Sequence, residues 1–223
     1  MDLFASAYGI ILQGGPVMWP LLFASVLALA VAFERMLFFR GALSSAEEVI
    51  ESATRRTQAG RIDEARAAAL RGGGPIGRVL AAGFDRWDNG APSCEKAMEE
   101  QAMVERDSLS RRLVVLDTTI TIAPLLGLLG TVIGMISAFD VVGANNQVGA
   151  PTAIMGGVAE ALIATATGLG IAIVVLLFFN YLNERVRQVI SLMEIAGTRL
   201  VNLRYEAEAE EEEGSHAPRA VSA

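Results

Sequence analysis

Glu160 is a carboxylate set within a long apolar segment, and its position is the strongest chemical signal in the chain. It lies about two helical turns into the run 153–179, AIMGGVAEALIATATGLGIAIVVLLFF. A carboxylate in hydrocarbon is costly, so it usually faces a bundle interior or a water path and carries function. The structural alternative is a carboxylate that reaches the interface or only links helices. Asp117 and Asp140, the other acids of 113–183, lie near the ends of the neighbouring apolar run.

The second feature of these runs is a set of small residues that lie on one face of each helix. Three glycines, spaced i, i+3 and i+7, share one face of the run 113–139: Gly127, Gly130 and Gly134. Small residues let another helix approach closely in a membrane, and Gly168 extends this property to the run 153–179. We expect the glycine face to pack against neighbouring subunits. Pro124 removes a backbone hydrogen bond and is expected to kink its helix.

Three apolar runs must position these residues: 16–33, 113–139 and 153–179. None of the 18 Lys and Arg residues falls in 1–34 or 113–184. About 20 apolar residues cross the hydrocarbon core as a helix, and the backbone must satisfy its own hydrogen bonds there. The fold class predicted is an all-α membrane protein with three transmembrane helices and long cytoplasmic helical extensions.

The basic residues also predict the orientation, because cytoplasmic loops are rich in Lys and Arg. We expect a multi-pass membrane protein whose N-terminus lies outside the cytoplasm and whose C-terminus lies in the cytoplasm. The segments predicted are an external N-terminus (1–15), transmembrane helix 1 (16–39), a cytoplasmic helical loop (40–112), transmembrane helix 2 (113–140), an external loop (141–152), transmembrane helix 3 (153–181), a cytoplasmic helix (182–205) and an acidic flexible tail (206–223).

The cytoplasmic loop is expected to form a series of helices. We expect them at 45–60, 62–70 and 76–87, with Ser45 opening the first through a capping box. The glycines after Arg71 and the following Pro75 are stop signals. From Ser93, a plausible N-cap, nothing interrupts the helical pattern, so one helix is expected from 94 to about 140.

Composition excludes several classes of protein. Six of the eight residues in 206–213 are Glu and carry most of the formal net charge of −7, so the acidity belongs to the tail. One Cys and one His argue against a zinc site, and no nucleophile–base pair appears. The segment Gly72–Pro75 lacks the Lys-Ser/Thr of a phosphate-binding loop. We therefore expect no enzyme activity, no cofactor, no metal site and no nucleic-acid partner.

Two motifs carry a resemblance to a known family. The stretch APLLGLLGTV at 123–132, together with AEALIATATGL at 159–169, resembles the TolQ/ExbB/MotA proton-channel family. Three spans and the large loop between the first two are similar to the ExbB/TolQ branch, since MotA-type stator proteins have four spans. One position departs from the pattern: Val174 stands where many relatives have Pro.

The resemblance implies a homopentamer around the single transmembrane helices of an ExbD- or TolR-like partner that brings an essential Asp. It implies that Glu160, Thr131 and Thr165 line the ion path. The location implied is the bacterial inner membrane, with a periplasmic N-terminus and a cytoplasmic C-terminus. The function implied is a proton channel subunit that couples proton motive force to this partner, and through a TonB- or TolA-like protein energises outer-membrane import or envelope maintenance. Two alternatives stay open: a sodium-driven stator subunit, and a non-conducting membrane scaffold.

Overall fold

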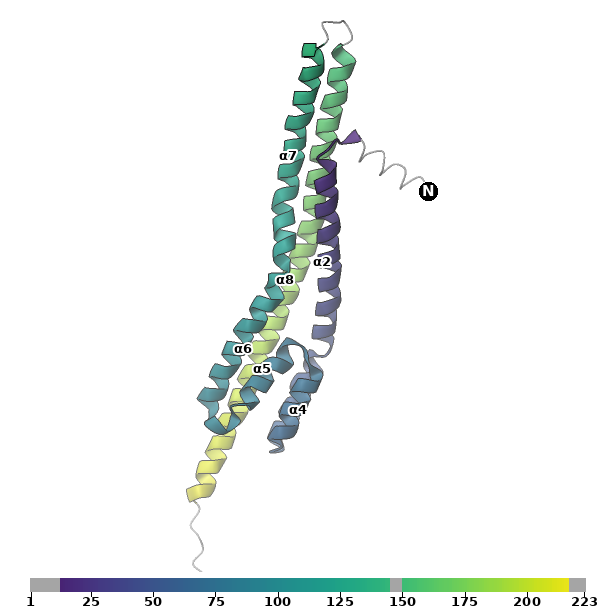
Figure 1. Ribbon diagram of the computed structural model, residues 1–223. Helices are drawn as coiled ribbons and strands as arrows, with labels where there is room; N and C mark the ends of the chain where they lie inside the picture. The colour runs from purple at the N-terminus through teal and green to yellow at the C-terminus, as the bar shows by residue number, and fades with distance from the viewer. Residues whose placement is uncertain (1–12, 145–149, 217–223) are drawn as a thin grey trace, which may run out of the picture. The chain divides into compact units, whose positions relative to one another are not determined.

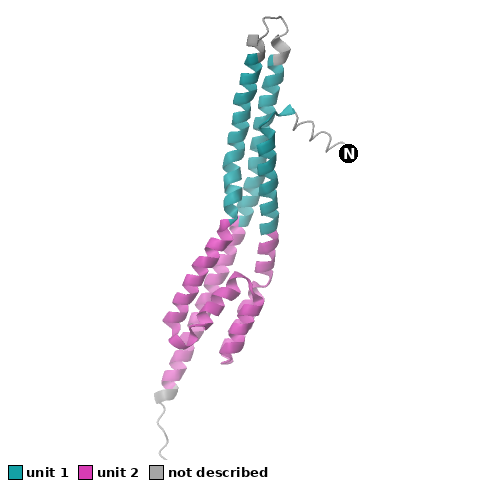
Figure 2. Ribbon diagram, viewed as in Figure 1, with its two compact units in different colours: residues 1–35, 112–182 teal, residues 36–111, 183–223 magenta. Residues whose placement is uncertain are grey.

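The computed structural model describes residues 13–144 and 150–216, and these residues form helices joined by short turns (Figure 1). Most of the predicted external segment 1–15, residues 145–149 of the predicted loop 141–152 and the end of the acidic tail lie outside the described residues. The rest of that predicted loop, 141–144 and 150–152, is helical, which corrects its bounds. Three helical stretches are long and apolar enough to cross a membrane, which confirms the predicted fold class. The chain divides into two compact units, residues 1–35 with 112–182 and residues 36–111 with 183–223 (Figure 2).

Unit 1 is built from three apolar helical stretches. They are the first part of α2 (Met18–Ser44), α7 (Leu113–Ala144) and the first part of α8 (Ala150–His216). The side chains that join them are Val17, Met18, Leu21, Ala123 and Ala172, all buried. α7 continues through Pro124 without interruption.

The glycine face of α7 packs against α8 of the same chain. A Cβ at Gly127 would lie 3.0 Å from Thr165 Cα, and one at Gly134 would lie 2.9 Å from the Gly157 carbonyl oxygen. A Cβ at Gly168 on α8 would overlap the Ala123 carbonyl oxygen. The expectation that this face meets neighbouring subunits is therefore wrong for these glycines, because α8 already occupies it.

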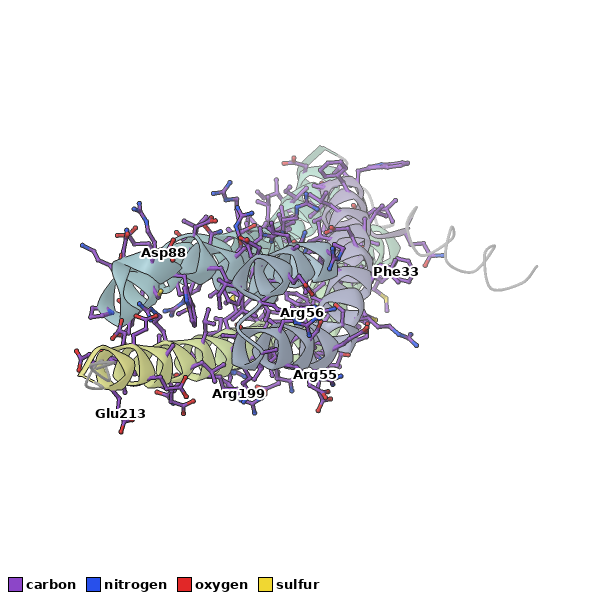
Figure 3. The ribbon with its side chains drawn as sticks, turned by 90° about the horizontal axis from the view of Figure 1, so that it is seen from below. Phe33, Arg55, Arg56, Asp88, Arg199 and Glu213 are labelled. Atoms are coloured by element: carbon purple, nitrogen blue, oxygen red, sulfur yellow. The ribbon has the colours of Figure 1, made fainter. Side chains whose placement is uncertain are left out.

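Unit 2 contains the short helices that connect the first two apolar stretches, together with the second part of α8. They are α3 (Ala46–Gln58), α4 (Ile62–Gly72), α5 (Gly74–Phe84), the 3₁₀ turn η1 (Trp87–Asn89) and α6 (Ala91–Arg111). α5 is buried along most of its length, as its apolar sequence GPIGRVLAAGF requires. By contrast, Arg55, Arg199 and Glu213 are exposed among the charged side chains drawn in Figure 3.

Glycine reverses the chain between α4 and α5. Gly73 and Gly74 have φ angles of 64° and 67°, a region that side chains disfavour, and Gly73 N–H closes α4 by donating to the Ala69 and Leu70 carbonyls. Pro75 then lies in the first turn of α5, where its missing N–H costs nothing. The predicted stop signal at this point is confirmed.

An ion pair joins α5 to α6. The Arg78 guanidinium donates to both carboxylate oxygens of Glu105 at 2.6 Å, and Gln101 donates to the same carboxylate. The hydrogen bonds from Arg78 to Glu105 raise the pKa of Arg78 above its usual value. The stability that comes from the raised arginine pKa is lost only when the pH rises through the arginine pKa, far above neutrality. This shift therefore does not make the pair a pH switch near neutrality.

The acidic segment 206–213 is helical, which corrects the predicted flexible tail for the part that the structure describes. Its carboxylates have partners: Glu208 accepts a hydrogen bond of 2.7 Å from Ala91 N–H at the start of α6, and Glu211 pairs with Arg204 at 3.2 Å. Arg204 in turn donates to the Trp87 carbonyl and lies over the Trp87 ring. Local pairing therefore offsets the repulsion among the glutamates.

Three other expectations on helix ends are wrong. The single helix expected from 94 to 140 is divided by a turn at Arg112, between α6 and α7. Ser45 does not cap α3 through its side chain, since its hydroxyl donates back to the Gly41 carbonyl. Ser93 lies inside α6, which begins at Ala91 because Glu208 satisfies the Ala91 N–H from a distant part of the chain.

The contact between α7 and α8 can be tested with two neighbouring glycines of α8. Gly168→Ala should lower the thermal unfolding temperature, because its Cβ overlaps the Ala123 carbonyl. Gly170→Ala, whose Cβ meets nothing within 4 Å, should be neutral or stabilising, since Ala gains about 0.5–1 kcal/mol over Gly in a helix. Circular dichroism in detergent measures both, and equal unfolding temperatures would contradict the packing described.

The Arg204 cluster in unit 2 can be tested against an exposed arginine of the same helix. Arg204→Ala removes the donor to the Trp87 carbonyl and the cation of Glu211, and should cost about 1.5–3 kcal/mol, the usual range for hydrogen bonds to charged groups. Arg199→Ala should cost little. The measurement is Trp87 fluorescence during urea unfolding in a Trp19→Phe background, and similar midpoints for the two variants would refute the cluster's role.

Candidate functional site

Glu160 is half-buried in unit 1 and lies against the turn that precedes α2. A Cβ at Gly15 would overlap its Oε1 atom, so the carboxylate and the backbone of Gly15 are in direct contact. Within the part of the chain that the structure describes, no cation or hydrogen-bond donor pairs with Glu160. A carboxylate in an apolar segment that has no partner among the described residues points to an occupant that these residues do not supply.

Thr131 and Thr165 both donate their hydroxyl protons to backbone carbonyls. Thr165 Oγ1 lies 2.9 Å from the Gly127 oxygen on α7, and Thr131 Oγ1 lies 2.6 Å from the Leu128 oxygen one turn earlier on its own helix. A hydroxyl that has donated its proton offers only its lone pairs to anything else. Both threonines therefore present acceptors, which suit water, a hydrated proton or a metal cation.

The pairing of the two helices places Glu160 and Thr131 about one helical turn apart along the helix pair. Ala161 lies against Gly134, and Ala164 lies against Gly127 and Gly130, so residues 160–164 run beside residues 127–134 in the antiparallel direction. Among the described residues, no hydrogen bond links Glu160, Thr131 and Thr165 to one another. The single chain thus places three polar groups along one stretch of helix pair without joining them into a cluster.

The acids at the ends of α7 lie apart from this stretch. Asp117 and Asp140 are both exposed, as expected for groups near the ends of an apolar run. Nearby threonines bond within their own helices: Thr119 donates to the Val115 carbonyl and Thr121 donates to the Asp117 carbonyl. These threonines satisfy backbone groups, which leaves Glu160 as the acid within the paired part of α7 and α8.

Gly15 is the contact that the sequence reasoning missed. It belongs to the pair Gly14–Gly15 before Pro16, at the start of the first apolar run. Two glycines followed by proline mark a turn. That signal was available, but it could not show that the turn lies against a residue about 145 positions later, since long-range contacts leave no local pattern.

Apolar side chains cover the outer faces of unit 1. The exposed ones on α2 include Trp19, Phe23 and Phe33, and α7 and α8 expose many leucines and isoleucines. Lipid or a neighbouring subunit can cover such a surface. The charges resume at the end of the first run, where Glu34 pairs with Arg35 at 2.8 Å and with Arg112 at 2.6 Å.

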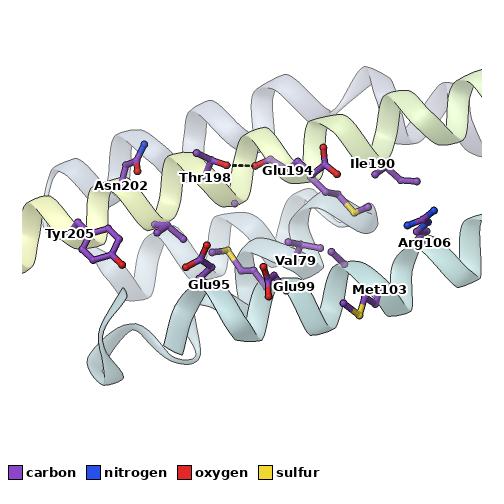
Figure 4. A pocket seen from close by; sticks show the side chains of 15 residues that line it. Val79, Glu95, Glu99, Met103, Arg106, Ile190, Glu194, Thr198, Asn202 and Tyr205 are labelled. Carbon is purple, nitrogen blue, oxygen red and sulfur yellow. Dashed lines mark hydrogen bonds between the residues drawn. The ribbon is translucent and has the colours of Figure 1, made fainter. Parts of the chain in front are cut away.

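A groove of about 640 Å³ lies in unit 2 between α6 and α8, with Val79 of α5 in its floor (Figure 4). Its apolar lining includes Met98, Met193 and Val201, and its rim carries Glu95, Glu99, Glu194, Arg106 and Tyr205. Met103, which also lines the groove, and the adjacent Val104 are more than half exposed. This sequence region is rich in charge and lies outside the apolar runs, so lipid chains cannot cover these side chains.

Comparison with known proteins agrees with the motifs and the fold. The family model described as the MotA/TolQ/ExbB proton channel family matches residues 73–195. An ExbB-like biopolymer transport protein of Synechocystis sp. is 35% identical over 191 residues, which cover 85% of this chain and 75% of that protein.

Two further relatives agree. A second ExbB-like protein of Synechocystis sp. is 30% identical, over 91% of this chain and 98% of its own length. The Tol-Pal system protein TolQ of Haemophilus influenzae is 37% identical over 94 residues, 42% of this chain and 41% of that protein. The chain therefore belongs to the MotA/TolQ/ExbB proton channel family, in its ExbB/TolQ branch.

Proposed function

We propose that the chain is the proton-conducting subunit of an inner-membrane complex that couples proton motive force to motion of a single-span ExbD- or TolR-like partner. The observation that carries this proposal is Glu160, an acid without a partner in the described residues, which lies on the apolar stretch of α8 beside the turn before α2 in a chain of a proton channel family. The acceptor oxygens of Thr131 and Thr165 support it, since they can hydrate a proton path. The protein acts in transport and not as an enzyme.

The energetics of such coupling are favourable. One elementary charge that moves through 100 mV releases about 2.3 kcal/mol, so a few protons supply the free energy for a mechanical step. In this scheme Glu160 attracts protons to the path and exchanges them with the Asp that the partner contributes. A TonB- or TolA-like protein then transmits the motion to the outer membrane.

The surfaces of both units support a homo-oligomer, which we propose to be a pentamer. The exposed apolar faces of α7 and α8 leave room for neighbours in the membrane. In unit 2, Met103, Val104 and the groove between α6 and α8 need protein to cover them. We place the N-terminus in the periplasm and the C-terminus in the cytoplasm, because the basic residues concentrate in 35–112 and after 184.

The proposal predicts that Glu160→Gln and Glu160→Ala both assemble normally and both lose proton flux. Gln keeps the shape of the side chain but removes the titratable group. Glu184→Gln is the matched control, because Glu184 is an exposed acid of the same helix that pairs with Arg187 outside the apolar run. The measurement is proton flux of the complex with its partner in proteoliposomes, together with native mass spectrometry.

The same experiment separates the alternatives. Full flux in Glu160→Ala would refute the channel role. If Glu160 only links helices, Gln should replace it well and Ala should reduce assembly without affecting flux per assembled complex. Flux that follows a sodium gradient and not a proton gradient would favour the sodium-driven stator, which can use the same carboxylate and hydroxyl oxygens.

A further inference from the structure

The turn before α2 lies on the face of α8 that carries Glu160. A Cβ at Gly15 would overlap Glu160 Oε1, and a Cβ at Gly14 would lie 3.2 Å from Cγ2 of Ile163. Glu160 and Ile163 are three residues apart and therefore share a face of α8. Both glycines of the turn thus lie close to α8, and at Gly15 a side chain would not fit, because the Glu160 carboxylate occupies the space.

The turn is held in place by the residues that follow it. Val17, Met18 and Leu21 are buried and pack with Ala123 of α7 and Ala172 of α8. The Met18 N–H donates to the Gly15 carbonyl at 3.1 Å, which closes the turn. Gly15 itself has a φ of 72°, a conformation that glycine adopts readily. The backbone at Gly15 is therefore fixed, and the long side chain of Glu160 is the part that can move.

We propose that Gly15 is a positioning residue for Glu160. Its missing side chain leaves space for the carboxylate beside the turn, and the turn thereby restricts where the carboxylate lies along the ion path. The position also favours a carboxylate, because it is at the N-terminal end of α2, where helix dipoles attract negative charge. Since no described cation pairs with Glu160, this contact is what restrains the group. The inference rests on the proposed function, in which Glu160 serves the path.

The test is Gly15→Ala, which adds the overlapping methyl group. Proton flux of the complex with its partner should fall about tenfold or more, since moving a reacting group by about 1 Å can cost ~10²-fold in rate. Gly60→Ala is the matched control: Gly60 has a φ of 70°, but its Cβ would meet nothing within 4 Å. It imposes the same backbone strain without touching Glu160, and it should keep wild-type flux.

A shorter acid provides the rescue. Glu160→Asp withdraws the carboxylate by one methylene, so Gly15→Ala should reduce flux much less in the Glu160→Asp background than in the chain that keeps Glu160. A purely structural effect of Gly15→Ala would instead lower flux by the same factor in the Glu160→Asp background and in the chain that keeps Glu160. If Gly15→Ala does not assemble, Gly15→Asn repeats the test, because Asn tolerates positive φ while its Cβ still overlaps the carboxylate.

A second measurement does not depend on conduction. The rate at which a hydrophobic carbodiimide modifies Glu160, followed by mass spectrometry, should rise in Gly15→Ala because the carboxylate leaves the turn that covers it. An unchanged modification rate, or equal flux losses in both backgrounds, would overturn the positioning role. If Glu160→Gln retained flux, the proposed function would fail instead, and the modification rate would still decide whether Gly15 positions the carboxylate.

Discussion

The close approach of α7 and α8 is the contact on which the membrane part of this protein depends. In lipid there is no hydrophobic force between helices, so packing and interhelical hydrogen bonds must hold them together. Gly127 and Gly134 on one helix and Gly168 on the other remove the side chains that would keep the backbones apart. The hydrogen bond from Thr165 to the Gly127 carbonyl crosses the same contact.

This contact has a direct consequence for the chemistry. Because Ala161 and Ala164 fit against the glycines of α7, the neighbouring Glu160 is turned away from that face and toward the start of α2. Thr165 donates its hydroxyl proton to the Gly127 carbonyl of α7, so it offers only acceptor lone pairs to other groups. The close packing of small residues thus determines which polar atoms remain for an ion, and the buried residues Val17 and Met18 hold the α2 turn beside the carboxylate.

Much of this could be predicted from the sequence, because the informative patterns are local. The absence of basic residues over long apolar runs predicted the helices, and Gly73 and Gly74 predicted the turn before α5. The motifs around Thr131 and Glu160 predicted the family, which the relatives confirm. Glu160 itself was recognised from its position in an apolar run, before any contact was known.

Three of the failures share a physical cause, since each depends on a partner far along the chain. Ser93 resembles an N-cap, but Glu208 satisfies the start of α6 from 117 residues away. The acidic segment resembles a frayed tail until Arg204 and the α6 N-terminus are brought beside it. The glycine face of α7 shows that a helix packs there, but its spacing alone cannot tell a helix of the same chain from one of a neighbouring subunit.

Ion conduction by the assembled complex tests the central claim most directly. The complex with its single-span partner would be reconstituted into vesicles, and proton uptake driven by an imposed membrane potential would be followed with a pH-sensitive dye in sodium-free buffer. Our account predicts proton uptake above that of empty vesicles, and only when the partner is present. Uptake no faster than in empty vesicles, or uptake that requires sodium, would contradict it.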